Sequence, residues 1–555
     1  MIKELKTKLG SALQSALGTA AEVARDSADP TWIPFLRRWM ILSLVLHAIT
    51  AVFSVGHHSA DEYFQILEFL NYKLGQTPVQ DLPVEFPEMM RPWLQPAIYY
   101  VVAKLWLLIG VSNPFTWALS FRMFAGFAGW LSTVILAVSA RYWFEDRRAR
   151  RFAVVVLALI WFFPALHVRP SSESMGGSAF LIGIGLASLG LVERLKSRFG
   201  KWAWIFVGAC FGLSFEGRFQ MALMVVGALA WLLLIGRAGW ARFKWIGCGG
   251  GAVFLIGRAV DAWGYGAIVL SPWRYFEYNL IRNEVSRYGN APWWDIFRMS
   301  FTESWPFLGL IVVIATLIAW ARHPKHVLTW SQIPFFLVHE WISHKELRFF
   351  FPIAAAAPIL LTLSVYSRST GRFLSFSPDE FGKEGRLLAA RLRLPVAGEG
   401  VKRWANRVWK FIVFNNVVAL VALMFLPFAR NVQFYEALYD RAAEATAKGG
   451  NFELYTESRD PFEVLGSRTY FYKPKGLVVR KLGNSDAFMR VLKEKRELHL
   501  FQTGLRARNE RSEFAPYCHV IFQTLPSWIT VFNFGNWVSR AQVWSLLNCR
   551  YPLGL

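Results

Sequence analysis

Cysteine and charged residues are both scarce in this chain of 555 residues. Its 4 cysteines are too few for a disulfide-rich scaffold, and no two of them have the CxxC spacing of structural zinc sites. We therefore expect no structural zinc site, and at most one disulfide, between Cys518 and Cys549. Charged residues make up only 18% of the chain, which excludes an ordinary soluble domain of this length.

Long apolar stretches take the place of the missing charges. Hydrophobic residues make up 54% of the chain, aromatic residues 16%, and the mean hydropathy is +0.30. These values are typical of a polytopic α-helical membrane protein. Twelve stretches are long enough to cross, or nearly cross, a hydrocarbon core of ~30 Å. They are residues 38–55, 96–111, 118–140, 152–166, 176–193, 203–216, 219–235, 245–262, 304–320, 329–343, 350–366 and 411–428.

The basic residues orient these stretches. The chain has 61 Lys and Arg against 38 Asp and Glu, a net charge of +23. On a soluble protein this excess would suggest nucleic-acid binding, but here it falls largely in connectors between apolar stretches, which is the pattern of cytoplasmic loops. The basic loop 367–410 is therefore predicted to be cytoplasmic, and the loop 262–303 to lie outside. We expect no nucleic-acid partner.

The number of crossings must fit this orientation. An N-terminus inside and a chain outside after residue 428 require an odd number, which twelve stretches do not give. The stretch 96–111 is short and contains Lys104, so we expect it to be re-entrant or to lie on the outer surface. The prediction is eleven transmembrane helices, within a range of about 11 to 13.

Three regions follow from this map. Residues 1–37 have small and apolar residues at helical spacing with early lysines, which predicts an amphipathic interfacial segment, a signal peptide being the alternative. Residues 38–428 form the predicted transmembrane catalytic domain. After residue 428, polar sequence alternates between strand-like and helical runs, so 429–555 is predicted to be a small soluble α/β domain outside the membrane.

The first predicted outer loop, residues 56–95, places two acidic residues after a membrane helix. In its HHSADEYFQILEF segment, Asp61 and Glu62 form a carboxylate pair. A carboxylate can serve as a general base, although the same pair could simply cap the following helix. The other polar candidates of this loop are His58, Gln65, Glu85 and Arg91. An ion pair explains the last two as well as substrate contact does.

Further polar residues follow predicted outer helix ends. Arg169 lies in HVRPSSES and Arg218 in SFEGRF, and each is either a functional group or a snorkelling anchor of its helix. The outer loop 262–303 is rich in Trp and Tyr and holds Asn279 and Tyr288. Aromatic rings and amides favour sugar binding, but aromatic belts also form next to lipid.

The segment SHKELRFFFPI gathers His344, Lys345 and Arg348 at a predicted outer membrane boundary. Chance basic residues at a helix end are more usual on the cytoplasmic side. Three potential cations at this place therefore indicate a phosphate clamp.

These motifs occur together in a known family. The chain has HxxxDEYFQxxE after the first helix, VEF and MMRP in the same loop, DxWGYG before YNxxxNxxxxYGxxPW, and HKELRFFFPI. The combination resembles glycosyltransferase family 22, the mannosyltransferases of glycosylphosphatidylinositol (GPI) and lipid-linked oligosaccharide assembly that use dolichyl-phosphate-mannose. The resemblance covers roughly residues 38–366. It implies a C-type glycosyltransferase fold and an inverting transfer that needs no metal.

The resemblance also implies roles for the candidates. Asp61 is the expected general base that takes the proton of the acceptor hydroxyl, and Glu62 is its support or the alternative base. The residues expected to bind the donor phosphate are His344, Lys345, Arg348 and Arg218. Substrate contacts are expected from His58, Gln65, Glu85, Arg91, Arg169, Asn279 and Tyr288. The lipid phosphate is already a good leaving group, so the site needs cations to hold it rather than an acid to protonate it. The resemblance implies no cofactor.

The predicted activity is transfer of mannose from polyprenyl-phosphate-mannose to a hydroxyl of a glycolipid or lipid-linked glycan on the extracytoplasmic face. The expected partners are thus membrane lipids, this donor and that acceptor. Transfer of another lipid-phosphate sugar, or transfer onto protein, is the alternative. A transporter of lipid-linked glycans is disfavoured, because the charged motifs cluster on one side and no internal repeat stands out. The expected location is a bacterial inner membrane with the site facing the periplasm, or the endoplasmic reticulum membrane in a eukaryote.

Overall fold

The computed structural model describes residues 29–192, 199–366, 399–457, 459–464, 466–483, 485–503, 516–525 and 543–552. Most of the predicted interfacial segment 1–37 lies outside these residues. The same is true of most of the predicted cytoplasmic loop 367–410 and of parts of the predicted domain 429–555.

The chain forms two compact units. Unit 1 contains the described residues up to Ala51 together with Met123–Phe425. Unit 2 contains Val52–Arg122 together with the described residues from Leu426 onward. Each unit therefore combines segments that are far apart in the sequence.

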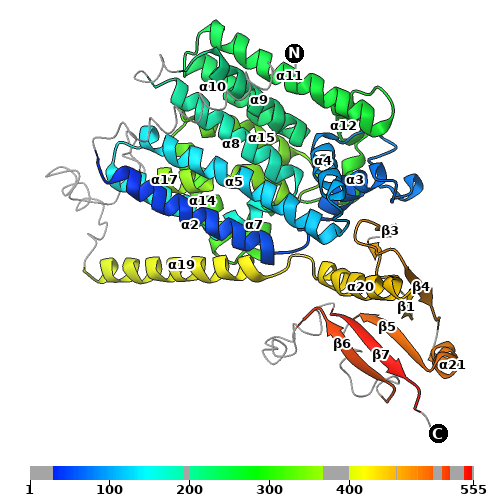
Figure 1. The fold of residues 1–555 in the computed structure, drawn as a ribbon. Coiled ribbons are helices and arrows are strands. Elements are labelled where there is room, and N and C mark those ends of the chain that lie inside the picture. The colour runs from blue at the N-terminus through cyan, green and yellow to red at the C-terminus, as the bar shows by residue number, and fades with distance from the viewer. Residues whose placement is uncertain are drawn as a thin grey trace. The chain divides into compact units, whose positions relative to one another are not determined.

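Unit 1 is helical throughout its described residues (Figure 1). Its elements are α2 (Trp32–Phe53), α5 (Pro114–Trp143, shared with unit 2), α6 (Arg147–Leu159), α7 (Phe163–His167), α8 (Ser172–Gly190), α9 (Lys201–Gly217), η4 (Phe219–Met221), α10 (Ala222–Leu234), α11 (Trp240–Tyr265), α12 (Ser271–Phe276), η5 (Glu277–Ile281), η6 (Glu284–Tyr288), α13 (Asp295–Thr302), α14 (Leu308–Arg322), α15 (Val327–Trp341), η7 (Leu347–Phe350), α16 (Phe351–Ala354), α17 (Ala357–Tyr366) and α19 (Glu399–Phe425). In their described residues all twelve predicted apolar stretches are largely helical, and three of them, 152–166, 219–235 and 350–366, are divided into more than one helical element.

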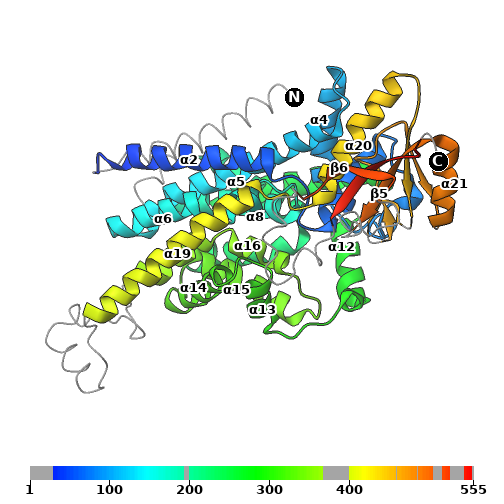
Figure 2. The same ribbon diagram turned by 90° about the horizontal axis from the view of Figure 1, so that it is seen from below.

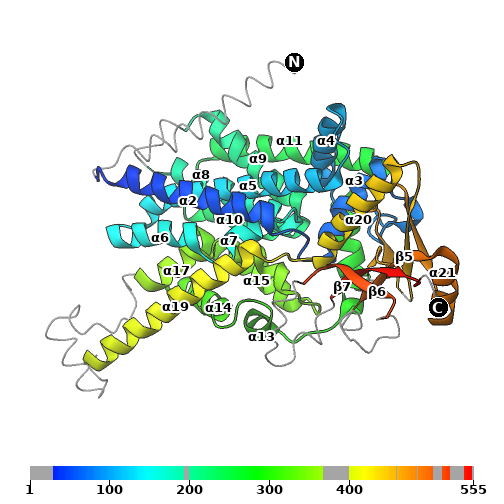
Figure 3. The same cartoon turned by 60° about the horizontal axis from the view of Figure 1, so that its bottom comes forward.

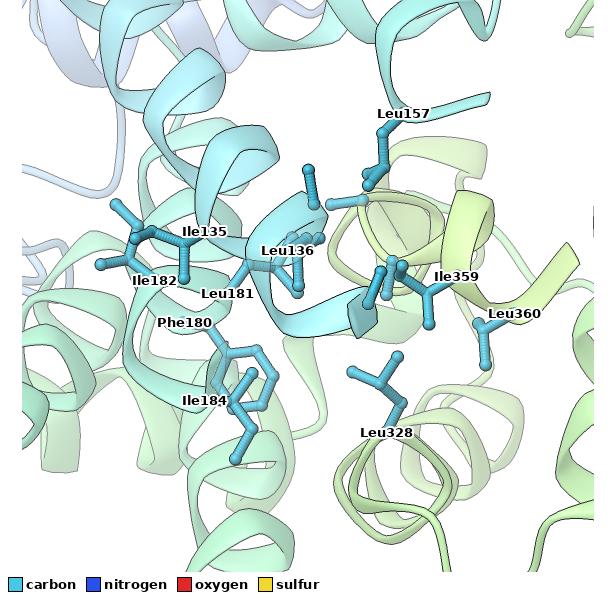
Figure 4. Packing of buried hydrophobic residues seen from close by; sticks show 14 of the residues in the cluster. Ile135, Leu136, Leu157, Phe180, Leu181, Ile182, Ile184, Leu328, Ile359 and Leu360 are labelled. Carbon is cyan, nitrogen blue, oxygen red and sulfur yellow. The ribbon is translucent and has the colours of Figure 1, made fainter. Parts of the chain in front are cut away.

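The core of unit 1 is apolar on several helices at once. Figure 4 shows side chains of α5, α6, α8, α15 and α17 meeting there, among them Leu136, Phe180 and Ile359. Helix α8 is buried on nearly all sides, because its sequence after Glu173 contains no charged residue. A helix that is apolar all round belongs to the interior of a protein or to a membrane.

Helices α2 and α5 lie alongside each other (Figures 1 and 2). A hydrogen bond joins them, because Trp130 Nε1 on α5 donates to the carbonyl of Met40 on α2 at 2.9 Å. The N-terminal half of α19 extends past the other helices of unit 1 (Figures 2 and 3). Its residues 403–407 are exposed accordingly.

Length and composition identify several possible membrane spans. Among the described residues, 4 segments are long and apolar enough to cross a membrane: α2, α5, α11 and Arg403–Ala447. The number rises to 6 if the bent pairs Leu308–Arg322 with Val327–Trp341, and Leu347–Ala354 with Ala357–Tyr366, each count as one span. The fold is thus of the helical membrane type, and the expected count of eleven to thirteen crossings stays a prediction.

Unit 2 joins the first predicted outer loop to the C-terminal region. Its helical elements are η1 (Glu62–Leu67), α3 (Glu68–Lys73), η2 (Val79–Asp81), α4 (Leu94–Leu108), α20 (Arg430–Ala447) and α21 (Ser485–Lys495). Its strands are β1 (Phe452–Thr456), β2 (Glu463–Val464), β3 (Ser467–Arg468), β4 (Leu477–Lys481), β5 (Glu497–Thr503), β6 (Cys518–Gln523) and β7 (Trp544–Arg550). Helix α4 has 15 residues, about 22 Å at 1.5 Å per residue, which is shorter than a hydrocarbon core.

A mixed five-stranded sheet forms the centre of the C-terminal region. The strand order is β4-β1-β5-β7-β6, with β1 parallel to β4 and β5, and β7 antiparallel to β5 and β6. Figure 3 shows β5, β7 and β6 side by side, with α20 and α21 nearby. Cys518 and Cys549 are paired in register on β6 and β7 and form a disulfide, as the sequence analysis allowed.

Buried Glu68 ties the two parts of unit 2 together. Its Oε1 accepts the backbone N–H groups of Tyr470 at 2.7 Å and Phe471 at 3.0 Å, and its Oε2 accepts the hydroxyl of Thr77 at 2.5 Å. Burial raises the pKa of Glu68, and these hydrogen bonds oppose that rise. The carboxyl group thus joins α3, which begins at the last residue of the DEYFQILE motif, to a segment 402 residues further along the chain.

Candidate functional site

The adjacent acids Asp61 and Glu62 have different surroundings in unit 2. Glu62 is buried, and its Oε1 accepts the backbone N–H groups of His58 at 3.1 Å and Ser59 at 3.4 Å. The side chain of Asp61, at the start of η1, is 32% exposed. Glu62 therefore fixes the loop, while Asp61 has the access that a general base requires.

Polar side chains line up beside Asp61. Arg91 Nη2 lies 3.9 Å from Asp61 Oδ2 and 3.7 Å from Glu85 Oε1. Gln65 Nε2 donates to the same oxygen of Glu85 at 2.8 Å. Four of the predicted loop residues thus form one continuous network, with a guanidinium between two carboxylates. The ring of His58 packs near Phe428, with 5.8 Å between the ring centroids.

A cluster of buried charges forms in unit 1, where α8 begins and α9 ends. Arg218, directly after α9, forms an ion pair with Glu173 in the first turn of α8, and both side chains are buried. Arg348 Nη1 lies 3.8 Å from the same Glu173 Oε1. Both guanidinium groups lie over the ring of Phe349, at 5.3 and 5.4 Å from its centroid. One carboxylate and one aromatic ring thus hold two arginines close together.

Glu346 organises the other side of this cluster. It accepts hydrogen bonds from Arg348 Nε at 2.6 Å and Nη2 at 3.0 Å, and His344 Nε2 lies 3.0 Å from its Oε1. Burial alone would raise the pKa of Glu346, but the hydrogen bonds from His344 and Arg348 lower it to about 2. Glu346 is therefore ionised at neutral pH.

Lys345 has a different set of partners from its neighbours. Its ammonium donates to the carbonyls of Glu340 at 3.0 Å and Ile342 at 2.7 Å, at the C-terminal end of α15. A cation at this end of a helix satisfies carbonyls that lack a partner within the helix. The structure thus gives Lys345 a capping role, and its contact with a donor phosphate stays a prediction.

We call Glu173, Arg218, Lys345, Glu346 and Arg348 the cationic cluster. Arg218 and Arg348 pair with Glu173 and Glu346, whereas Lys345 bonds to carbonyls at the end of α15 and lies near the carboxylates of Asp295 and Glu340. Guanidinium and ammonium groups gathered in this way can bind phosphate oxygens.

The remaining predicted residues of unit 1 have local contacts. Arg169 is buried in the turn between α7 and α8, where its backbone N–H donates to the carbonyl of Leu166 at 3.3 Å. Asn279 Nδ2 donates to the carbonyl of Tyr275, one turn back, at 2.9 Å. The ring of Tyr288 lies 6.0 Å from that of His344, centroid to centroid. Tyr288 therefore lies beside the SHKELRF segment.

Glu173, Glu346 and Phe349 were not among the residues predicted from the sequence. Glycines were the signal that could have located Glu173. Gly176 and Gly217 approach so closely that a Cβ on Gly217 would come within 3.0 Å of the Gly176 backbone. This approach brings the start of α8 to the end of α9, and with it Glu173 to Arg218. The partners of Phe349 cannot be read from the sequence, because they come from separate helices.

A second buried ion group fastens α9 to α11. Arg258 Nη2 donates to Glu216 Oε1 at 2.9 Å and Oε2 at 2.6 Å, and its Nη1 lies 2.7 Å from Asp261 Oδ2. Both carboxylate side chains are fully buried. Glu216 lies two residues before Arg218, so this ion group holds in place the C-terminal end of α9, which directly precedes that arginine.

The fold and the site define a helical membrane protein with a small C-terminal mixed sheet. The structure of ArnT from Cupriavidus metallidurans, solved with bound undecaprenyl phosphate, has this fold. The structural match covers 94% of this chain and 98% of the ArnT chain, with 13% sequence identity and a TM-score of 0.50. At this identity the likeness concerns the fold alone.

The chain belongs to the Alg9-like mannosyltransferase family, whose model matches residues 38–453. This match confirms the family that the motifs indicated. Two similar proteins are the GPI mannosyltransferase 3 of Debaryomyces hansenii, 22% identical over 273 residues, and that of Gibberella zeae, 22% identical over 393 residues. The alignments span 48% and 62% of this chain, and 39% and 62% of these relatives.

Proposed function

We propose that the protein transfers mannose from a polyprenyl-phosphate-mannose donor to a hydroxyl of a glycolipid or lipid-linked glycan. The observation that carries the proposal is the cationic cluster, in which Arg218 and Arg348 share Glu173 and lie over the ring of Phe349. The donor phosphate is an anionic diester, and paired guanidinium groups bind phosphate oxygens. Membership of a mannosyltransferase family and a fold similar to a protein solved with undecaprenyl phosphate support the same reading.

The proposed chemistry is a single displacement with inversion. Asp61 removes the proton from the acceptor hydroxyl while that oxygen bonds to the anomeric carbon of mannose. The bond between this carbon and the phosphate oxygen breaks, and the electron pair leaves with the lipid phosphate. Arg218 and Arg348 stabilise the charge that develops on the leaving phosphate. Glu62 holds the loop that carries Asp61.

We propose that the reaction takes place on the extracytoplasmic face. The disulfide between Cys518 and Cys549 supports this side, because such bonds persist in oxidising compartments. The periplasm of a bacterium and the lumen of the endoplasmic reticulum both meet this condition.

A donor panel tests the proposed function. The purified full-length protein is given polyprenyl-phosphate-mannose, the glucose analogue and the aminoarabinose analogue, each with a glycolipid extract. We expect turnover of the mannose donor and a product of inverted anomeric configuration by NMR. Preferred turnover of another sugar, or a retained configuration, would contradict the proposal.

A further inference from the structure

The segment between α11 and α14, residues 266–307, presents large aromatic side chains to its surroundings. The exposed members are Trp273, Phe276, Tyr288, Trp293, Trp294, Phe301 and Phe307. Trp293 is 68% exposed. Soluble surfaces seldom expose so many large rings in so short a segment, and such exposure marks an interaction surface. We call residues 266–307 the aromatic segment.

The charges of the aromatic segment are arranged unevenly. Arg287 pairs with Glu284 at 3.0 Å, and the arginine is 77% exposed against 18% for the glutamate. Arg298 pairs with Asp295 at 2.6 Å, with 50% against 8%. In each of these pairs the carboxylate is covered and the guanidinium faces outward. In both pairs the guanidinium group is thus the more exposed partner, although Arg298 also lies 3.8 Å from Glu303, which is 47% exposed.

Arg274 and Arg282 repeat this arrangement around one carboxylate. Both pair with Glu277, at 3.8 and 2.8 Å, and both are more exposed than it is. A surface of rings and outward guanidinium groups is complementary to the headgroup layer of a bilayer, which offers phosphates beside the upper acyl chains.

The position of the aromatic segment fits a lipid partner. It follows α11, which is long and apolar enough to cross a membrane, and precedes α14, part of a bent pair with the same property. It also contacts the SHKELRF segment of unit 1. The backbone N–H of Ala291 donates to the carbonyl of Ser343 at 2.8 Å, and Tyr288 lies beside His344.

We propose that the aromatic segment is a docking surface for phospholipid headgroups. Its rings lie at the level of the headgroups, and its outward arginines bind lipid phosphates. The proposal concerns bulk lipid and does not depend on the proposed transfer, so it can fail while the transfer stands. Through Ala291 and Tyr288 it connects the lipid surface to the loop that carries His344.

Site-directed spin labelling in bilayers tests this surface directly. The full chain, with the exposed Cys248 replaced by serine, receives a single cysteine by Trp273→Cys or by Trp293→Cys. The labelled protein is placed in nanodiscs of phosphatidylcholine and phosphatidylglycerol. Collision with oxygen, which concentrates in lipid, is compared with collision with a water-soluble nickel complex. Arg480→Cys, on β4 of the C-terminal sheet, is the aqueous control, because this arginine is 54% exposed and lies in none of the segments that could cross a membrane.

We expect labels at both tryptophan positions to collide more often with oxygen than with nickel, and the control label to show the reverse. Replacing Arg287 and Arg298 together by glutamine should then shift the label at position 293 towards the water. Labels as accessible to nickel as the control would overturn the proposal. The proposal would also be overturned if the bilayer leaves the labels open to nickel and only added polyprenyl-phosphate-mannose reduces their collisions with it. That result would indicate a sugar-binding surface.

Discussion

At the scale of residues, neighbouring groups of the same chemistry have different partners. Asp61 is partly exposed beside Arg91, whereas Glu62 is buried and bonded to backbone N–H groups. Arg348 bonds to two carboxylates, whereas Lys345, three positions earlier, bonds to carbonyls of α15. The sequence alone gives each pair the same chemistry. Packing assigns the different environments.

Glu346→Gln tests whether the ionised carboxylate of Glu346 stabilises the cationic cluster, through the pH dependence of the melting temperature. The hydrogen bonds from His344 and Arg348 hold the pKa of Glu346 at about 2, below its ordinary value of 4.5. Because the pKa of Glu346 is lower in the folded protein, its ionised carboxylate stabilises the fold fully above pH 4.5. This stabilisation is lost as the pH falls towards 2 and the carboxylate takes up a proton. We expect the variant to melt at a lower temperature at pH 6, with a difference that shrinks below pH 4.5. A difference independent of pH would show that the ionised carboxylate is not the stabilising form.

Arg348→Lys tests whether the cluster needs a planar cation. Lysine keeps the charge but cannot bond to Glu346 through two nitrogens or stack in the same way on Phe349. We expect a rise of about tenfold in KM for the donor, corresponding to one lost charge-assisted hydrogen bond of about 1.5 kcal/mol. The exposed Arg480→Lys is the matched control and should leave KM unchanged. An unchanged KM in the Arg348 variant would remove this residue from the phosphate site.

Residue types could be predicted more readily than their partners. The network of Asp61, Gln65, Glu85 and Arg91 lies within one loop, and its members were all named from the sequence. Glu68 stands in the same motif but received no role, because its backbone partners lie 402 residues away. Local sequence shows which groups are chemically suitable, and only the fold shows which of them meet.

At the scale of elements, glycine determines how closely helices α9 and α11 pack. A Cβ on Gly208 would fall within 3.0 Å of the Ile246 carbonyl, and one on Gly249 within 3.0 Å of the Ile205 carbonyl. Small residues allow such backbone contact between membrane helices. The apolar stretches predicted both helices, but the sequence did not show which faces meet, because α11 also has glycines with no close neighbour.

Gly249→Ala should loosen this helix pair. The added methyl group forces the backbones apart, and overpacking of this kind costs about 1–3 kcal/mol. We expect a lower melting temperature in detergent and reduced transfer, since α9 carries Arg218 at its end. Gly247→Ala and Gly251→Ala, on the same helix with open space around them, are the controls. Equal melting temperatures in all three variants would refute the packing argument.

At the scale of the whole molecule, chain order and spatial order differ. The apolar pattern predicted the helical membrane fold, and alternating polar runs predicted the C-terminal sheet. The grouping of 52–122 with 426–555 in one unit could not be predicted, because long-range pairing leaves no local signal. The family match shows that this architecture belongs to a mannosyltransferase family.

The disulfide between Cys518 and Cys549 leads to a prediction about stability and membrane side. It closes a sequence separation of 31 residues, so Cys518→Ser should lower the free energy of unfolding by about 2–4 kcal/mol. Replacing the free, exposed Cys248 by serine should have little effect. An impermeant maleimide should label positions 518 and 549 in intact cells only after reduction. Labelling without reductant would contradict an oxidised extracytoplasmic domain.

The most direct test of the account is mannose transfer by the purified full-length protein and its Asp61→Asn variant. The assay uses polyprenyl-phosphate-mannose and a glycolipid extract, with donor binding measured in parallel. Glu62→Gln is the comparison variant, because Glu62 bonds to the loop backbone. We predict that Asp61→Asn binds donor normally but loses about 10²–10⁴-fold in kcat, while Glu62→Gln loses less. Full activity in Asp61→Asn, or no mannose transfer by the unaltered protein, would contradict the account.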